Sequence, residues 1–383
     1  MKHKLLTLVL VVAVIVSMVV VGCAKPAPPA PAPAPSPAPS PAPAPAPAPQ
    51  PQEVIELKFG HQNPPTGRTT VKYLDAWAQK VEEATNGRVK ITMYPAQSLF
   101  KSKEAYEACR GGITDLNWTI VGYYTGRFPL TSVMGLPFLC LPSGHIDGKL
   151  RSGGAVNSHI LQELYETLPE IQAEWKEVKV IMLNGTSPYL LYTTKKPVRN
   201  LQDLQGMKFR ELGGYSAKMW ELLGATPLNM GMPDVYESAS KGVIDGADVP
   251  WAAFVTYNFW EVFKYWTDVA TLESPQMMIM NLDKWNSLPP DIQEAIMSVG
   301  GMYGAEFAGD AGWGFEVKDE SLAAAEKAGK PVERVELDPG EYEKWKEIAG
   351  KPIWDQWVED MNSKGLNGQK VLDKTLELLD KYK

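Results

Sequence analysis

The residue with the most evident binding chemistry in this sequence is an arginine at the end of a short alternating segment. Residues 206–210 predict a strand with Met207 and Phe209 on one face and two basic side chains on the other. A guanidinium at the carboxyl end of a strand offers a planar pair of donors that fits a carboxylate. Most arginines are solvated surface residues, and the pattern leaves that alternative open. Arg210 is thus a candidate for binding a carboxylate group.

The sequence lacks the motifs of common catalytic and metal-binding sites. His61, His145 and His159 lie far apart, and neither an HExxH segment nor a pair of neighbouring cysteines is present. The GxSxG, GxxxxGK and strand-linked GxGxxG motifs are absent as well. We therefore predict no catalytic residue, no metal ion and no cofactor. Carboxylate-based catalysts carry no reliable motif, so an enzyme remains an alternative.

The elements that must position Arg210 alternate between strands and helices. Residues 54–59 predict a strand, followed by a polar loop over residues 61–65. A helix is predicted over residues 69–86, ending in Asn-Gly, and a second strand over residues 89–93. This rhythm favours an α/β fold with a parallel sheet covered by helices.

A weak internal repeat suggests two equivalent units. The two copies begin near residues 106 and 236. The pattern of each copy predicts a helix, a glycine that ends it and a short strand, and the two strands are expected at residues 113–116 and 243–246. Pairing the copies aligns Trp118 with Asp248, just beyond the two predicted strands. Ligands of open α/β sheets bind beyond the carboxyl ends of strands, so these neighbourhoods are expected to face each other across a cleft. Chance can also produce the four matches. The matching positions, 130 residues apart, are Tyr106-Glu107, Gly112 and Asp115 with Tyr236-Glu237, Gly242 and Asp245.

Further along the chain, residues 177–184, 190–193 and 203–209 predict strands, the last after a turn. After Pro289 the pattern becomes helical through a stretch that is rich in glycine. Because glycine permits both bends and close backbone approach, we expect this long helix to be kinked or closely packed.

The amino-terminal residues predict export. A basic segment, residues 2–4, precedes an apolar run over residues 5–21 that Gly22 and Cys23 close. The run is shorter than the roughly 20 residues of a spanning helix, which favours a signal peptide over residues 1–22 rather than a membrane anchor. Its end resembles the lipobox of bacterial lipoproteins, although a valine stands where leucine is preferred. That resemblance implies that Cys23 is acylated and carries a lipid anchor.

Residues 24–52 are almost pure alanine and proline, a composition that favours polyproline II and cannot build a core. At about 3.1 Å per residue, such a linker holds a domain up to about 80 Å from a membrane. A tail without function has the same composition. The remaining residues, 53–383, are numerous enough that we expect two lobes rather than one hydrophobic nucleus.

The charge balance limits the classes of partner that the protein can bind, and the cysteines raise the question of a disulfide. The chain has 38 basic and 45 acidic residues, which disfavours nucleic acid and anionic membranes as partners. A buried site for a small anion remains compatible, because it depends on a few local donors. Cys109 and Cys140 can pair in an oxidising compartment, but both are easier to interpret as small buried residues.

Five segments stand in the order typical of one protein family, and together they cover residues from about 55 to 290. They are Thr85-Asn86-Gly87-Arg88-Val89 with Tyr94-Pro95, Gly112-Ile113-Thr114-Asp115, Leu136-Pro137-Phe138-Leu139, Lys196-Pro197-Val198 with residues 203–210, and Gly242-Val243-Ile244-Asp245-Gly246. In this order the chain resembles the solute-binding subunits of TRAP (tripartite ATP-independent periplasmic) transporters, of the dicarboxylate-binding type.

The resemblance implies a two-lobed, hinged α/β receptor with a type II periplasmic-binding-protein fold and a long kinked helix spanning the lobes. Lobe 1 is expected over about 53–183 plus about 271–310, and lobe 2 over about 184–270 plus the C-terminal helices. It also implies that Arg210 pairs with the carboxylate of a small organic acid, over which the lobes close. The closed receptor, a monomer held at the membrane only by its lipid anchor in the periplasm or at the cell surface, would then dock on the TRAP permease.

Two departures from the family pattern bear on the ligand. Sugar-acid and dicarboxylate binders often carry a second arginine where this chain has Pro188-Tyr189, so one cation is missing. Tyr189, Trp118 and Trp251 instead suggest a monocarboxylate with an apolar or aromatic body. His61 and Asn184 are further candidates for ligand contact. Asp248 is interpreted as part of a surface turn, with contact to a ligand hydroxyl or a metal ion as the alternative.

Two other functions remain open. A solute-binding protein of an ABC importer would have the same export signal and the same cleft, but a different membrane partner. A periplasmic enzyme would turn over the ligand it binds.

Overall fold

The computed structural model describes residues 54–383. The predicted signal peptide at residues 1–22, the lipid anchor at Cys23 and the linker over residues 24–52 lie outside the described residues. Within residues 54–383, none of the helices combines the length and hydrophobicity that a membrane span requires.

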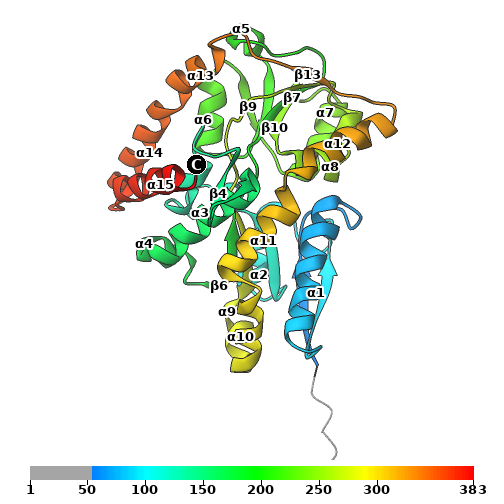
Figure 1. The fold of residues 1–383 in the computed structure, drawn as a ribbon, viewed down its shortest axis with the longest axis vertical. Coiled ribbons are helices and arrows are strands. Elements are labelled where there is room, and N and C mark those ends of the chain that lie inside the picture. The colour runs from blue at the N-terminus through cyan, green and yellow to red at the C-terminus, as the bar shows by residue number, and fades with distance from the viewer. Residues whose placement is uncertain (1–53) are drawn as a thin grey trace, which may run out of the picture. The chain divides into compact units, whose positions relative to one another are not determined.

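The described residues fold around two mixed sheets, one in each lobe, as Figure 1 shows. The lobe 1 sheet has the order β2-β1-β3-β12-β6, in which β1 is parallel to β2 and β3, while β12 is antiparallel to β3 and β6. Its strands are β1 (Ile55–Gly60), β2 (Val89–Tyr94), β3 (Leu116–Ile120), β6 (Val178–Asn184) and β12 (Gln276–Asn281).

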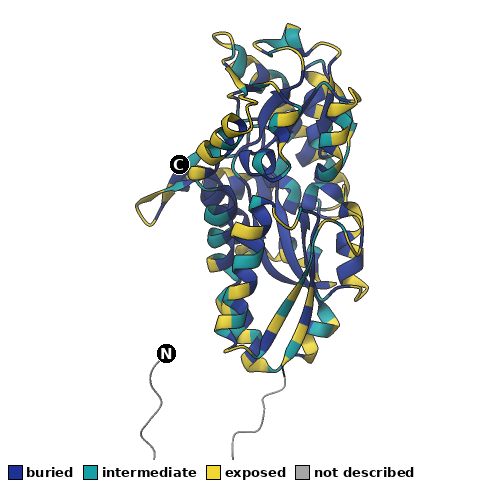
Figure 2. Cartoon of the chain, turned by 90° about the vertical axis from the view of Figure 1, so that its right-hand side faces the viewer, coloured by how far each residue is buried: buried dark blue, intermediate teal, exposed yellow. Residues whose placement is uncertain are grey.

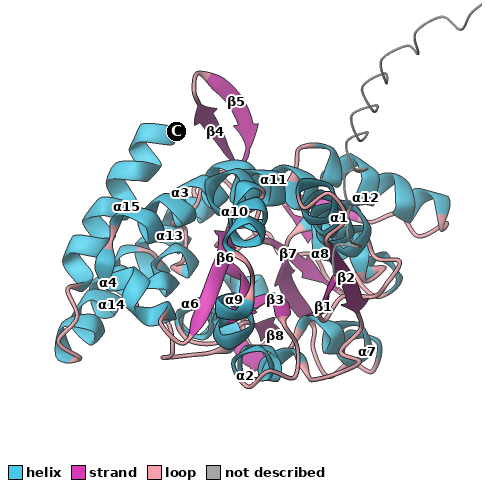
Figure 3. Cartoon of the chain, turned by 90° about the horizontal axis from the view of Figure 1, so that it is seen from below, coloured by secondary structure: helices cyan, strands magenta, loops and turns pink. Residues whose placement is uncertain are grey.

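The lobe 2 sheet has the order β13-β11-β7-β10-β8-β9, and β8 is parallel to both of its neighbours. A separate hairpin, β4 (Ser143–Ile146) and β5 (Lys149–Ser152), projects beside α3 in Figure 3. The strands of lobe 2 are β7 (Leu190–Thr193), β8 (Lys208–Glu211), β9 (Thr226–Asn229), β10 (Gly246–Val249), β11 (Tyr265–Thr267) and β13 (Glu333–Val335).

Helices cover both sheets, and β3, β6, β7, β10 and β12 form the buried interior. The edge strands β2 and β9 and the outer helix faces are partly exposed (Figure 2). The C-terminal helices run along one side, where α13 packs on α6 and α15 packs on α3. The helices are α1 (Asp75–Ala84), which extends a π-helical turn at Thr70–Leu74, α2 (Ala105–Arg110), α3 (Gly153–Thr167), α4 (Pro169–Gln172), α5 (Leu201–Leu204), α6 (Tyr215–Leu222), α7 (Val235–Ser240), α8 (Trp251–Thr256), α9 (Leu282–Ser287), α10 (Pro290–Ser298), α11 (Gly301–Trp313), α12 (Glu316–Lys327), α13 (Glu341–Ala349), α14 (Lys351–Ser363) and α15 (Gly368–Tyr382).

The predicted repeat is confirmed, but its strands begin later than predicted. Both α2 and α7 are followed by a glycine with positive φ, and Asp115 and Asp245 each accept a hydrogen bond from the backbone N–H of a lysine in the neighbouring strand. Residues 113 and 243 still belong to the helix ends, because their N–H groups bond back to carbonyls of α2 and α7. The strands therefore start at residues 116 and 246, and Trp118 and Asp248 lie within them rather than beyond them.

The glycine-rich helix is kinked, as predicted. It breaks at Gly300 and again at Gly314, which gives α10, α11 and α12. α11 packs on α3 and β6 of lobe 1, whereas α12 packs on α8 of lobe 2. The second break is held by Arg68, which donates to the carbonyl of Gly312 at 2.9 Å and pairs with Glu316 at 2.9 Å. The bent helix thus connects the lobes, together with residues 185–189 and 268–275.

Candidate ligand-binding site

A small pocket lies between the lobes, at the carboxyl ends of several strands. Lobe 1 contributes residues that follow β1 or belong to β3 and β12, and lobe 2 contributes residues that follow β9 and β10. Its volume of about 20 Å³ has room for little more than one water molecule, so the lobes are tightly closed. The lining residues are Gln62, Asn63, Thr69, Trp118, Ile120, Tyr189, Met232, Pro250, Ala253, Tyr257, Gln276 and Trp313.

Hydrogen bonds between the lobes hold this pocket shut. The hydroxyl of Tyr257 in lobe 2 donates to Asn63 Oδ1 in lobe 1 at 2.7 Å. Beside it, the N–H of Thr69 donates to Thr256 Oγ1 at 3.2 Å. Asn63 lies in the loop after β1 and Thr69 at the start of the following helix, and each bond joins one of them to α8 or to the residue after it, so opening the cleft requires that both bonds be broken.

The walls of the pocket hold polar atoms that have no hydrogen-bond partner. They include Gln62 Oε1, Asn63 Nδ2 and Trp118 Nε1, each from a side chain that is at most 3% exposed. Leaving a buried donor or acceptor unpaired costs about 1 to 3 kcal/mol. Their gathering between the lobes is typical of a site whose partner atoms come from a ligand.

Arg210 lies behind this pocket and is fully buried, rather than solvated at the surface. Its Nε donates to the carbonyl of Met230 at 3.2 Å and its Nη1 to the carbonyl of Asp248 at 3.2 Å, while Nη2 has no partner. Burial raises the pKa of Tyr189 and of Tyr257, and in both cases the nearby charge of Arg210 opposes the rise. Both tyrosines line the pocket, so the guanidinium of Arg210, which is not itself a lining residue, lies close enough to affect the charge state of the pocket walls.

Asp248 corrects the interpretation as a surface turn, because it is a fully buried residue of β10. Its register opposite Leu191 of β7 places it in the middle of the lobe 2 sheet. One carboxylate oxygen accepts a hydrogen bond from Trp220 Nε1 at 3.2 Å, and the other has no partner. That free oxygen lies 3.9 Å from Arg210 Nη1. The side chain therefore pairs with the arginine.

Residues 59–360 match the family described as DctP, bacterial extracellular solute-binding protein, family 7. The chain belongs to this family. Its members are extracytoplasmic solute receptors, and those of TRAP transporters work with membrane permease subunits.

Three solved structures show the same two-lobed fold. A TRAP solute-binding protein from Rhodoferax ferrireducens, with copurified benzoate, is 27% identical, with a TM-score of 0.78 over 86% of this chain and 98% of that chain. A marine metagenome protein specific for aromatic acid ligands, in complex with metahydroxyphenylacetate, is 30% identical, with a TM-score of 0.77 over 86% and 99%. A protein from Bordetella bronchiseptica with bound (R)- and (S)-mandelate is 27% identical, with a TM-score of 0.73 over 85% and 99%.

The other candidate residues of this solute-binding protein divide into two groups. Trp118 and Tyr189 line the pocket, whereas His61 is not a lining residue. His61 directly precedes Gln62 of the pocket and is buried, with both ring nitrogens unpartnered. Burial lowers the pKa of His61 to about 4, so its ring is neutral near pH 7. Asn184 and Trp251 do not line the pocket. Asn184 donates to Gln276 Oε1 at 3.1 Å, and Trp251 packs among aromatic residues of lobe 2.

Sequence reasoning missed several lining residues. Gln62 and Asn63 belong to the polar loop predicted after the first strand, so their position carried a signal. Tyr257, Gln276 and Trp313 carried none, because each reaches the pocket from an element far away in sequence. No group of three or more metal-ligating side chains occurs within residues 54–383. Cys109 and Cys140 are free thiols there.

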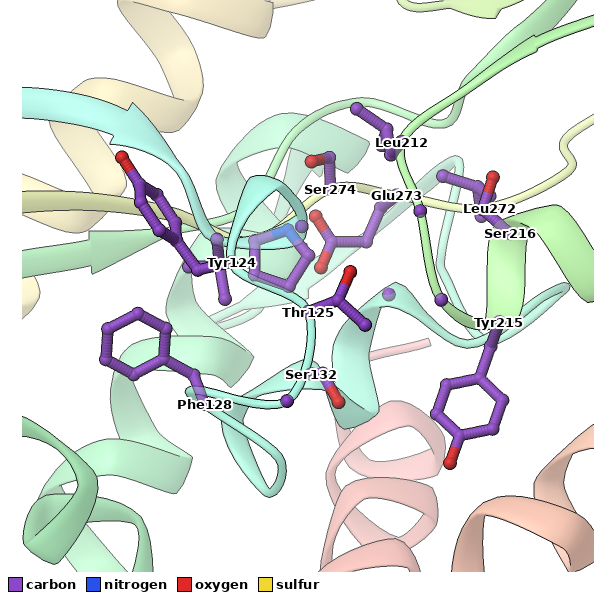
Figure 4. Close-up of a pocket in the computed structure, with 17 residues that line it drawn as sticks. Tyr124, Thr125, Phe128, Ser132, Leu212, Tyr215, Ser216, Leu272, Glu273 and Ser274 are labelled. Carbon is purple, nitrogen blue, oxygen red and sulfur yellow. The ribbon is translucent and has the colours of Figure 1, made fainter. Parts of the chain in front are cut away.

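A second cavity, of about 80 Å³, lies where residues 121–135, the start of α6 and residues 272–275 meet. Figure 4 shows the carboxyl group of Glu273 among its lining residues, with the hydroxyl of Thr125 turned toward it. One carboxylate oxygen of Glu273 accepts from the N–H of Thr186 at 2.9 Å, and the other has no partner. No residue lining this cavity, all of it within residues 54–383, is cationic, so the cavity is poorly suited to an organic anion.

Proposed function

We propose that this protein is an exported receptor that captures an aromatic or otherwise apolar monocarboxylic acid and delivers it to a TRAP permease. The observation that carries the proposal is the buried guanidinium of Arg210, with a free donor, behind a pocket lined by Trp118, Tyr189 and Tyr257. A single cation suits a single carboxylate, and the aromatic side chains suit an apolar body. The acids named with the three similar structures, benzoate, hydroxyphenylacetate and mandelate, support this substrate class.

The proposal includes the route of the protein to its site of action. The basic and apolar start of the chain supports a cleaved signal peptide, and the lipobox-like ending supports acylation at Cys23. The alanine and proline linker would then tether a monomeric receptor to the membrane. The cycle is capture, closure and docking on the permease, without covalent chemistry.

The first prediction concerns the acid specificity and the role of Arg210. Calorimetric titration with benzoate, mandelate, 3-hydroxyphenylacetate, succinate and malate is expected to rank the three aromatic monocarboxylates first. Arg210→Lys keeps the charge but loses the planar fork, and charge-assisted hydrogen bonds contribute about 1.5 to 3 kcal/mol each. We therefore expect Arg210→Lys to weaken the best acid by about tenfold or more.

The matched control is Arg334→Lys, an exposed arginine of the same lobe that pairs with Asp268 at 2.8 Å. It is expected to leave every affinity unchanged. Tightest binding by succinate or malate would disprove the aromatic preference. Unaltered affinity in Arg210→Lys would remove the arginine from the site.

A further inference from the structure

The pair formed by Arg210 and Asp248 is incomplete on both sides. Both side chains are fully buried, yet the shortest distance between their charged atoms is 3.9 Å, which is too long for a hydrogen bond. Arg210 Nη2 and Asp248 Oδ1 have no hydrogen-bond partner. A buried ion pair normally needs close geometry to offset its desolvation, and this pair lacks it.

The charges around an ionised Asp248 do not offset the negative charge that a bound ligand carboxylate would add. Arg210 on β8 is the one cation that affects its ionisation within the described chain, while Glu211, also on β8, adds a negative charge. Trp220 from α6 contributes a neutral donor, and Tyr189 faces the pair as a neutral hydroxyl. If Asp248 is ionised, its carboxylate and that of the arriving ligand must share the single positive charge of Arg210. In a site of low dielectric constant, that excess negative charge is costly.

We propose that Asp248 is a proton site coupled to the ligand, so that the cleft binds one carboxylate at Arg210 together with one proton on Asp248. The proton comes from solvent and adds to Oδ1, the oxygen without a partner, so that Asp248 becomes neutral and the charge of Arg210 is left for the acid. This inference rests on the proposed function, because it concerns the same site. It makes Asp248 a residue that selects for singly charged acids.

The ionisation of the neighbouring groups supports this assignment. Burial raises the pKa of Asp248 to about 7, and the charge of Arg210 opposes that rise. When a ligand carboxylate engages Arg210, the opposition weakens and the pKa of Asp248 increases further. Among the other groups near the pocket, His61 and three tyrosines stay neutral between pH 6 and 9, because burial lowers the pKa of His61 and raises those of Tyr123, Tyr189 and Tyr257.

The expected pH dependence follows from proton linkage. Below about pH 7 the free receptor already carries the proton, so affinity for the acid is constant. Above that pH, each molecule of acid must bring a proton with it, and the association constant falls by up to about tenfold per pH unit. Aromatic carboxylic acids have pKa values near those of other carboxyl groups, so the ligand itself stays ionised throughout.

The experiment is a calorimetric titration of the full-length protein with benzoate, mandelate or 3-hydroxyphenylacetate from pH 6 to 9. At pH 8, titrations in phosphate and in Tris, which differ in ionisation enthalpy, count the protons taken up. We expect uptake of nearly one proton per acid at pH 8. Asp248→Asn, which keeps an acceptor for Trp220, is expected to flatten the pH profile and to bind about tenfold or more tightly than the wild type at pH 9.

The control is Asp234→Asn, which removes an exposed carboxylate two residues from Met232 of the pocket and is expected to keep the wild-type profile. Acid binding with the same affinity at pH 6 and 9 and no proton uptake would overturn the inference and leave the proposed function standing. A slope that persists in Asp248→Asn would overturn it as well. Failure of all three acids to bind at any pH would overturn the proposed function and this inference together.

Discussion

Glu273 is a second carboxyl group buried between the lobes, in the segment that joins β11 to β12. Burial raises its pKa well above the usual value. The folded state then holds its proton more tightly than the unfolded chain, so this group lowers stability progressively as pH rises above the unfolded pKa. Glutamine keeps the acceptor for Thr186 and removes the titration. Glu273→Gln should therefore unfold at a higher temperature than the wild type at pH 8, with the difference shrinking toward pH 4.

Scanning calorimetry from pH 4 to 8 tests this, with Glu306→Gln as a control of opposite sign. The hydrogen bond from His159 holds the pKa of Glu306 below its usual value, and Arg151 adds to this effect. Its contribution to stability is present above the unfolded pKa and is lost as pH falls through the folded pKa. Glu306→Gln should be less stable than the wild type at pH 8 and approach it at acid pH. Equal melting temperatures of Glu273→Gln and wild type at pH 8 would contradict the first expectation.

At the scale of residues, the sequence was most informative where chemistry and local pattern coincided. The alternation in residues 206–210 was enough to single out Arg210, and the aromatic identities of Trp118 and Tyr189 marked two residues that line the pocket. Asp248 was misjudged because the segment that contains it resembles a turn, with glycine before it and proline after it. Its burial depends on pairing with β7 and β8, which no local pattern reveals.

Among the elements, α3 and α11 approach each other closely because a glycine of each helix, Gly154 and Gly309, lies against the backbone of the other. A Cβ on Gly309 would lie 2.5 Å from Ala155 Cα, and a Cβ on Gly154 would lie 2.6 Å from the carbonyl of Gly309. Gly309→Ala should destabilise the fold by about 1 to 3 kcal/mol, because the two backbones would have to separate. Urea unfolding measures the change.

Gly312 of the same helix provides the matched control. A Cβ there would meet Tyr73 at 3.8 Å, which is an ordinary contact. Gly312→Ala should therefore gain about 0.5 to 1 kcal/mol from the helix preference of alanine. Destabilisation of both variants to the same extent would show that the loss in Gly309→Ala does not come from the helix crossing.

Elements were predicted better than their boundaries. The kink of the long helix was predicted from its glycines. The repeat was predicted from residues that end a helix in the same geometry at two places in the chain. The strands at residues 116 and 246 began later than predicted, because residues 113 and 243 are β-branched and suggest strand when considered alone. Hydrogen bonds back to the preceding helix outweigh that preference, and both side chains are left exposed.

At the scale of the molecule, polar contacts between the lobes stabilise the closed form, among them those of Thr256 at the end of α8. Thr256→Val removes both the acceptor for the Thr69 N–H and the 3.0 Å contact between the two hydroxyls, while it preserves side-chain shape. The closed state would lose about 1 to 2 kcal/mol of stability relative to the open state, and the affinity for the acid would therefore fall by about tenfold. Small-angle scattering of the acid-free variant should show a larger radius of gyration if the wild type is mostly closed, and titration measures the affinity in either case.

The control for this variant is Thr267→Val, whose hydroxyl donates to Val198 at 3.0 Å within lobe 2 alone. It should cost stability but leave the affinity for the acid unchanged. Wild-type affinity in Thr256→Val would mean that the contact between Thr69 and Thr256 does not contribute to closure.

The position of β12 in its sheet also bears on how such a chain is made. β12 lies between β3 and β6, yet the chain reaches it only after all the strands of lobe 2 except β13. Until then, β3 and β6 each lack a neighbour and present an open edge. The lobe 1 sheet can therefore close only when residues 276–281 return from lobe 2, so the last step in building one lobe depends on the chain having already passed through the other.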